Sequence, residues 1–264
     1  MILFKKNYYI SLGEKVMVSV YFFGVLFNLT FQTLSFIHGK PLGVRRIFEQ
    51  AKKIGVDSLP IVSLVSFFIG MILALQTAYI MQKMSSEIYI ASIVAVSLTR
   101  ELGPVITALI VAGRCGAGIT AELGTMTVTE QVDALATLGS NPIKYLVVPR
   151  YLSLTIMMPI LTLFANAIGI FGGYLIGIYR LSIRSSLYMN MTFQTLVYKD
   201  IFTGLIKTIF FGMIIAIIAC YEGLNVRGGA EGVGKATTRS VVNTFIMIIA
   251  ADCFFTALFY IFWS

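Results

Sequence analysis

Four ionisable residues lie inside long apolar stretches of this sequence: Arg100, Glu101, Lys207 and Asp252. A charged side chain at the centre of an isolated membrane helix costs on the order of 3 kcal/mol, so such residues face protein, water or one another. Two interpretations remain open for these four residues. They form a structural ion-pair network that holds helices together, or they line or gate a polar part of a substrate path. The two overlap, because an ion-pair network with two arrangements can act as a gate.

The pairing of these charges follows in part from helix geometry. Arg100 and Glu101 are adjacent, so their side chains point about 100° apart on a helix and need not pair with each other. We expect each of them to have a partner on another span. The predicted pairs are Lys207 with Glu101, and Asp252 with Arg100.

A second motif has the spacing of a phosphate-binding loop. "GAEGVGKA", from Gly229 to Ala236, matches G-x-x-x-x-G-K, but Ala236 replaces the Ser or Thr that would hold magnesium, and an apolar stretch of membrane length precedes it. We interpret it as a flexible Gly-rich turn that leads to "KATTRSVV" at the start of the last helix. The chain has one histidine, His38, which argues against a histidine-based metal site. We therefore predict a non-catalytic chain that binds no metal and no cofactor.

The elements that position these residues are predicted to be membrane helices. The 264 residues are 58% hydrophobic and 12% charged, with a mean hydropathy of +0.88, far from the balance of a soluble domain. A helix needs about 20 apolar residues to cross a hydrocarbon core. We predict an all-α integral membrane protein, with five-span domain 58–264 and spans near 58–81, 89–113, 150–178, 201–221 and 241–263.

The N-terminal region, 1–57, is predicted to be interfacial. Residues 16–37 are apolar but are diluted by polar residues such as Asn28 and Gln32. They lead into the basic, amphipathic "GVRRIFEQAKKIG", from Gly43 to Gly55. This pattern favours a helix that lies in or partly enters the membrane over a sixth full span.

The positive residues predict an orientation. With the first region cytoplasmic and five crossings, fourteen of the twenty Lys and Arg residues lie inside and four outside, and two lie within spans. The N-terminus is then cytoplasmic, the C-terminus is periplasmic, and 114–149 and 222–240 are the cytoplasmic loops. The membrane surface accounts for the net charge of +8, so no nucleic-acid partner is expected.

Small residues and prolines mark where the spans pack or bend. Small residues at four-residue intervals let two membrane helices approach closely. The second span carries Ala108, Ala112 and Gly116, and the third span carries Gly169, Gly173 and Gly177. Pro104 and Pro159 lie within spans, where the missing backbone donor favours a kink or break.

The first predicted cytoplasmic loop contains a short helix near 129–138. Thr129 is placed to cap it, and polar or acidic residues follow in the first turn: Glu130, Gln131 and Asp133. Leu135 belongs to its apolar stripe, and Gly139 ends it. An acidic end with an apolar stripe suits docking into a groove on a soluble partner. The alternative, a helix resting on lipid headgroups, is less favourable for acidic residues on an anionic leaflet.

These residues carry a family resemblance. "RELGPVITALIVAGRCGAGITAELGTMTVTEQVDALATLGSNPIKYLVVPR", from Arg100 to Arg150, resembles the signature region of MlaE (YrbE-type) permeases, the membrane subunits of bacterial lipid transporters that work with MCE-domain proteins. Weaker similarity extends through "FFIGMILALQ", "GLIKTIFF", "GKATTRSVV" and "DCFFTAL". The resemblance implies a homodimer in the bacterial inner membrane, each copy with an N-terminal membrane-associated helix and five spans.

The resemblance also implies partners and site residues. A cytoplasmic ABC ATPase dimer would bind ATP and Mg²⁺, and a periplasmic MCE-domain protein would lie on the outer face. Segment 129–138 would be the coupling helix. Phospholipid would occupy a cavity at the dimer axis, and the four intramembrane charges match positions of that cavity. The positions implied to contact acyl chains are Leu73, Ile80, Met81 and Met84.

The expected function is therefore that of an ABC transporter permease that moves phospholipid between the inner membrane and a periplasmic MCE-protein pathway. The alternative is an ion- or proton-coupled secondary transporter of a hydrophobic substrate, in which Glu101 and Asp252 titrate. A purely structural membrane scaffold is a third interpretation. The direction of transport and the lipid headgroup are left open by the sequence.

Overall fold

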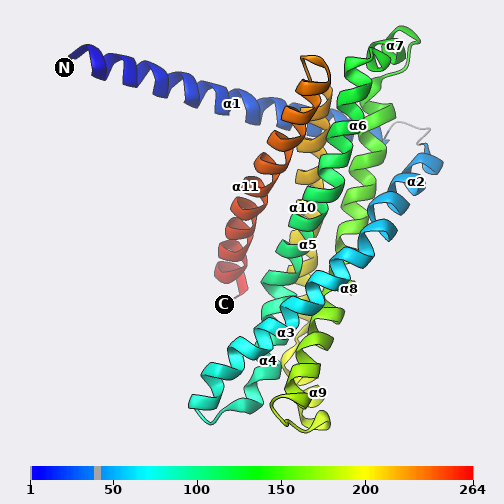
Figure 1. Ribbon diagram of the computed structural model, residues 1–264. Helices are drawn as coiled ribbons and strands as arrows, with labels where there is room; N and C mark the ends of the chain where they lie inside the picture. The colour runs from blue at the N-terminus through cyan, green and yellow to red at the C-terminus, as the bar shows by residue number, and fades with distance from the viewer. Residues whose placement is uncertain (1, 39–42, 264) are drawn as a thin grey trace.

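The structure, a computed structural model, describes the backbone of residues 2–38 and 43–263 and the side chains of residues 17, 20–37 and 43–262. All regular structure in that part of the chain is helical, as predicted (Figure 1). Six of the described helical runs are long and apolar enough to cross a membrane. Five of them match the predicted spans, the last one to within one residue, and the sixth is Val20–Ile37.

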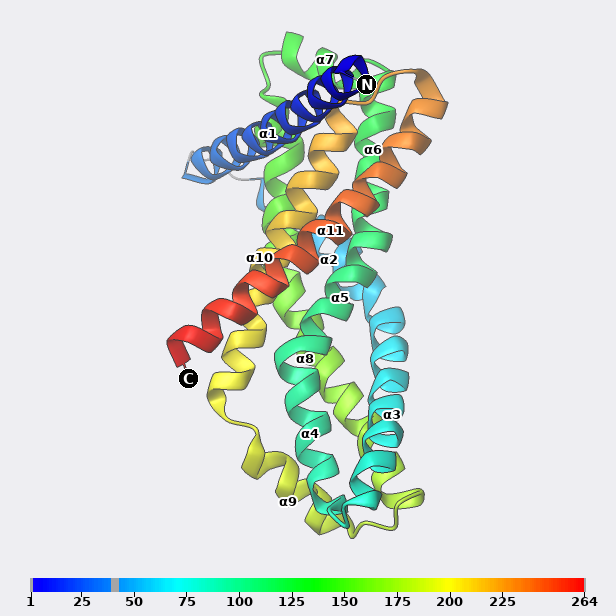
Figure 2. The same cartoon turned by 90° about the vertical axis from the view of Figure 1, so that its left-hand side faces the viewer.

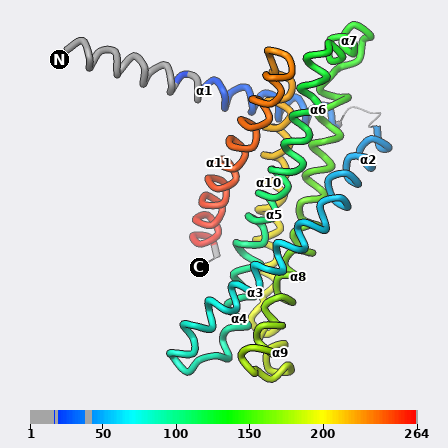
Figure 3. Tube along the Cα trace, in the orientation of Figure 1, coloured from blue at the N-terminus to red at the C-terminus, as the bar shows by residue number. Residues whose placement is uncertain are grey.

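The N-terminal helix, α1 (Ile2–His38), runs across one end of the bundle in both cartoon views (Figures 1 and 2). Its length and composition would permit a sixth span, and its interfacial position stays a prediction. The amphipathic segment forms α2 (Val44–Ile54), as predicted, with Ile54 buried. A short 3₁₀ turn, Val56–Ser58, joins α2 to α3 (Leu59–Lys83), and the two follow nearly one line in Figure 3.

The second span is longer than predicted. It comprises α4 (Ile90–Ser97), α5 (Gly103–Val111) and α6 (Ala117–Val128), which are joined by the π-helical turns Leu98–Leu102 and Ala112–Gly116. The predicted cytoplasmic segment 114–149 is therefore mostly helical and contains more helix than the short one expected near 129–138. The added helix is stabilised by tertiary contacts, because the Thr120 hydroxyl hydrogen-bonds to the Ala219 carbonyl at 3.1 Å and Leu123 is fully buried.

The second predicted loop, 222–240, is also mostly helical. Helix α10 (Tyr198–Leu224) ends near its start, and α11 (Gly229–Trp263) begins five residues later. "GAEGVGKA" thus forms the first turns of α11 and is not a flexible turn. The chain reverses just before and at the first residue of the motif, where Gly228 and Gly229 adopt φ values of +92° and +66°. Contacts with α6 order the segment, since Ala236 is buried and the Thr120 hydroxyl donates to Ser240 Oγ at 2.8 Å.

Glycines allow α3 and α8 (Val148–Tyr179) to pack closely. A Cβ atom at Gly70 would overlap the carbonyl oxygen of Gly169, and one at Gly172 would overlap the carbonyl oxygen of Phe67. Gly169 comes from the predicted glycine series, whereas Gly70 and Gly172 were not singled out from the sequence. The remaining two glycines of that series, Gly173 and Gly177, lie against Tyr188 of α9 (Ser185–Thr195).

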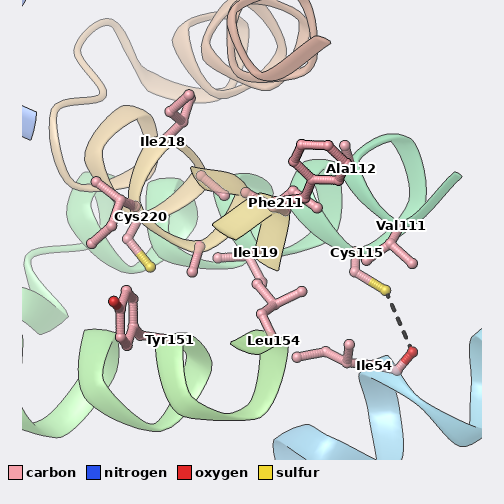
Figure 4. Packing of buried hydrophobic residues seen from close by; sticks show 14 of the residues in the cluster. Ile54, Val111, Ala112, Cys115, Ile119, Tyr151, Leu154, Phe211, Ile218 and Cys220 are labelled. Carbon is pink, nitrogen blue, oxygen red and sulfur yellow. Dashed lines mark hydrogen bonds between the residues drawn. The ribbon is translucent and has the colours of Figure 1, made fainter. Parts of the chain in front are cut away.

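The main hydrophobic core surrounds α10. Phe211 and Ile215 of this helix have no exposed surface. Figure 4 shows Phe211 together with Leu154 of α8 and Ile54 of α2 in one cluster. Helix α8 continues through Pro159 without a break, and Pro104 begins α5 directly after the first π-helical turn.

Candidate functional site

A buried ammonium group is the centre of the candidate site. The side chain of Lys207 on α10 is 1% exposed. Its Nζ atom donates hydrogen bonds to Glu101 Oε2 at 2.5 Å, Asp252 Oδ1 at 2.9 Å and Thr256 Oγ1 at 2.7 Å. An ammonium group has three donors, so Lys207 is fully satisfied by three acceptors. We call Lys207, Glu101, Asp252 and Thr256 the lysine cluster.

Three helical elements bring the lysine cluster together. Glu101 lies on the π-helical turn Leu98–Leu102, Lys207 on α10, and Asp252 and Thr256 on α11. Gly204, one turn before Lys207, permits close contact, because a Cβ atom there would overlap the carbonyl oxygen of Thr99. π-Helical turns within α-helices are frequent at functional sites.

The lysine cluster is open on its acidic side. The side chain of Glu101 is 38% exposed and that of Asp252 is 22% exposed. The Thr256 hydroxyl lies 3.2 Å from Glu101 Oε2, within hydrogen-bonding distance. Two carboxylates surround one ammonium, so the cluster carries one excess negative charge. At membrane depth this edge can accept hydrogen bonds from a polar or cationic group.

Arg100 belongs to a separate ion pair. Its Nε atom lies 3.6 Å from Asp200 Oδ1, and its side chain is 47% exposed. The predicted pair of Lys207 with Glu101 is present, but the predicted pair of Arg100 with Asp252 is wrong. Glu101 faces α11, whereas Arg100 points away from it toward the start of α10. Asp200 was not among the predicted partners, because it lies at the edge of a predicted span.

The residues predicted to contact acyl chains lie on α3 or directly after its end, and they divide into two groups. Leu73 and Met81 are partly buried and pack against a second small core that includes Ile90 and Val94 of α4. Ile80 and Met84 are 53% and 65% exposed. Their contact with lipid stays a prediction.

The predicted coupling helix is α7 (Gln131–Thr137), at the far end of the molecule in Figure 1. The expected Thr129 cap is wrong, since its hydroxyl donates to the Thr125 carbonyl at 2.8 Å and Thr129 ends α6. Glu130 precedes α7 in a left-handed conformation, with φ of 60°. Of the residues predicted to contact the ATPase, Glu130, Gln131 and Asp133 are exposed. Leu135 is partly buried and packs against the main core.

The end of α7 is closed as predicted. Gly139 has a φ of +74°, a left-handed conformation that favours glycine. The Ser140 amide donates to the Leu135 carbonyl at 3.0 Å, which is the bond of a Schellman motif.

An ionic brace near α7 was not foreseen from the sequence. Arg150 of α8 is nearly buried and donates to Glu122 Oε1 of α6 at 2.7 Å, and Lys53 of α2 donates to Glu122 Oε2 at 2.9 Å. Glu122 thus fastens three helices. A buried carboxylate, Glu222 of α10, similarly accepts from Arg239 of α11 at 2.6 Å. The sequence shows these acids only as isolated residues near span ends.

Comparison with known proteins places these features in a family. A family model described as "Permease MlaE" matches residues 47–258. A probable ABC transporter permease protein of Rickettsia prowazekii is 49% identical over 237 residues, which cover 90% of this chain and 92% of the relative. A probable ABC transporter permease protein of Synechocystis is 38% identical, with 89% of each chain covered.

A further relative carries a more specific description. The intermembrane phospholipid transport system permease protein MlaE of Haemophilus influenzae is 36% identical over 259 residues, which cover 96% of this chain and 98% of the relative. The similarity therefore extends over the lysine cluster, α7 and both ionic braces. With the family model covering the first four predicted spans and most of the fifth, the chain belongs to the MlaE family of ABC transporter permeases.

Proposed function

We propose that the chain is the membrane subunit of an ATP-driven transporter that moves phospholipid between the bacterial inner membrane and a periplasmic MCE-protein pathway. Such movement would serve lipid trafficking and the lipid asymmetry of the outer membrane. The observation that carries the proposal is the lysine cluster, a polar site at membrane depth in a chain of the permease family. The phospholipid in the name of the Haemophilus relative supports the substrate class.

The driving force would come from a separate cytoplasmic ABC ATPase dimer. The only loop-like glycine motif with P-loop spacing ends in Ala236 and forms the start of a helix, so it is unsuited to holding nucleotide and Mg²⁺. Helix α7 exposes Glu130 and Asp133 at the end of the bundle, where a soluble partner can reach them. ATP and Mg²⁺ would bind to that partner.

A helical run, separated from α7 only by the turn at residues 129–130, leads from α7 to the lysine cluster. The run from α6 through α5 leads to the π-helical turn that carries Glu101. Glu122 ties this run to α2 and α8 through Lys53 and Arg150. A displacement of α7 on closure of the ATPase would move α6 and shift Glu101 relative to Lys207. The polarity of the proposed lipid cavity beside the lysine cluster would then change during the transport cycle.

The proposed assembly contains two copies of the chain, with the α7 end in the cytoplasm and the MCE-domain protein at the opposite face. Two copies would form the lipid cavity between them, lined in part by Ile80 and Met84. Methionine side chains are flexible and tolerate varied acyl chains.

Reconstitution tests the proposal. The chain is expressed together with the other components of its transporter and extracted in mild detergent. It should then co-purify with an ABC ATPase. In proteoliposomes, the complex should transfer fluorescent phospholipid to an MCE-domain acceptor only when ATP is hydrolysed. Transfer that persists without ATP and follows a proton gradient would instead support the secondary-transporter alternative and overturn the proposal.

A further inference from the structure

A pocket separate from the lysine cluster lies where α1 meets the turn between α10 and α11. Its volume is about 570 Å³. Aromatic residues of α1 and α10 line one side, and polar residues of the α10–α11 turn and α11 line the other. In Figure 1 this junction is at the α7 end of the bundle, beside the crossing of α1 and α11. We call it the elbow pocket.

The charges of the elbow pocket favour an anion. The Glu222 side chain is 3% exposed and accepts hydrogen bonds from Arg239 Nε at 2.6 Å and Asn243 Nδ2 at 3.0 Å. Arg239 therefore neutralises Glu222, and only its Nε is used, so its two terminal nitrogens remain available as donors. Arg227 is exposed, and no hydrogen bond or ion pair joins its side chain to another described residue. The pocket thus has one excess positive charge.

The other wall of the elbow pocket has the character of a membrane interface. Phe22 packs edge-on against Tyr221, with ring centroids 5.4 Å apart, and Tyr21 is 70% exposed. Tyrosine is enriched at the level of lipid headgroups, because its ring is apolar and its hydroxyl is polar. A ligand in this pocket would therefore be at headgroup depth.

An apolar stripe continues from the pocket along α11. Val242, Ile246 and Ile249 are 51%, 60% and 59% exposed. They follow Arg239 at intervals of three, four and three residues, so all four lie on one face of the helix. Only 6% of the apolar window of α11 is buried within the chain. One helix face therefore presents a cation at headgroup depth and an apolar strip below it.

We propose that the elbow pocket binds an anionic phospholipid of the leaflet at the α7 end, with its phosphate between Arg227 and Arg239 and its acyl chains along the stripe. Basic pockets between membrane helices bind acidic lipid headgroups in this way. The bound lipid would hold α1 against the bundle. It is distinct from a transported lipid, because the lysine cluster offers an acidic edge and the elbow pocket a basic one.

Native mass spectrometry of the purified full-length chain tests this site. The chain is stripped of lipid and titrated with phosphatidylglycerol or phosphatidylcholine of identical acyl chains. Near a membrane surface one Arg contributes about 1 kcal/mol, so Arg227→Gln should weaken phosphatidylglycerol binding about fivefold. Arg227→Lys should retain binding. Arg45→Gln, which removes an exposed Arg elsewhere at the same end, should change nothing, and phosphatidylcholine should not distinguish the variants.

Two further arms identify the occupant. Inorganic phosphate tests whether a free anion suffices: if it binds in an Arg227-dependent manner while phosphatidylglycerol does not, the lipid assignment is overturned. A Val242→Cys variant in a Cys253→Ser background tests for a second copy on the stripe, and a disulfide between two chains would also overturn it. Equal phosphatidylglycerol binding by the native chain and the Arg227→Gln variant would also overturn the lipid assignment. Because these measurements need neither ATP nor a partner, failure of the proposed transport function would leave them interpretable.

Discussion

Lys207 differs from its neighbours in the lysine cluster because it is the only cation among three acceptors. Loss of one carboxylate leaves the ammonium with the other carboxylate and a hydroxyl. Loss of the ammonium leaves Glu101 and Asp252 facing each other without a cation. The consequences of substitution at these positions should therefore be unequal.

We expect Lys207→Met to lower the free energy of unfolding by about 3–5 kcal/mol, the usual cost of removing one partner from a buried ion pair. Glu101→Gln should cost less than half as much, because Asp252 still neutralises Lys207. Unfolding followed by circular dichroism in detergent micelles measures both changes. Arg100→Gln is the control, since its pair with Asp200 is half-exposed and worth roughly 1 kcal/mol or less. Equal losses for Lys207→Met and Glu101→Gln would contradict the central role of Lys207.

At the scale of elements, α3 and α8 depend on glycine contacts for their spacing. Gly70→Ala would drive a methyl group into the Gly169 carbonyl, and only movement of one helix can relieve the overlap. Overpacking of this kind costs about 1–3 kcal/mol, which a shift of the thermal midpoint in detergent would report. Gly118→Ala is the matched control, because no atom lies within 4 Å of the added Cβ and alanine favours a helix. A Gly70→Ala protein as stable as this control would show that the helices do not need the close contact.

A further prediction concerns helix α7 and assembly of the chain with the ATPase. Reversing both exposed acids, Glu130→Lys with Asp133→Lys, should abolish co-purification of the ATPase while the chain still inserts in the membrane. The physical reason is that a groove suited to an acidic helix end repels a basic one. The control is the double reversal Glu49→Lys with Glu231→Lys, which changes the net charge by the same amount at other positions. It should leave co-purification of the ATPase intact. Full recovery of the ATPase with the α7 variant would refute the coupling assignment.

At the scale of the whole molecule, the apolar helices are buried to very different extents. The apolar window of α10 is 56% buried within the chain, compared with 17% for α1 and 6% for α11. One chain alone thus surrounds α10 and leaves α1 and α11 largely uncovered. This asymmetry fits a subunit whose remaining apolar faces contact lipid or a second copy.

The proposed cavity is a property of the assembled molecule and can be probed from α3. Ile80 is exposed on one face of this helix, and Leu64, also exposed, lies on the opposite face. A photo-crosslinking residue at Ile80 should capture phospholipid more often than one at Leu64 when the chain is in its transporter, and mass spectrometry of the adducts measures the difference. Equal capture at both positions would mean that Ile80 only faces bulk lipid.

The sequence by itself determined the all-α membrane fold, the positions of the five spans and the short helix near 129–138. These properties depend on runs of neighbouring residues: an apolar stretch of sufficient length, the periodicity of α2 and the helix-ending Gly139. The family resemblance rested on the same kind of local pattern. The similarity over 47–258 confirmed it.

Only the tertiary structure decided which charges pair and where helices end. Asp200 rather than Asp252 faces Arg100, because the rotation of α10 and α11 about their own axes is set by packing between residues far apart in the chain. The helical start of α11 depends on contacts with α6 in the same way, as does the position of Gly70 opposite Gly169. Local sequence specifies which segments become helices, whereas the register and rotation of those helices follow from the contacts made between them.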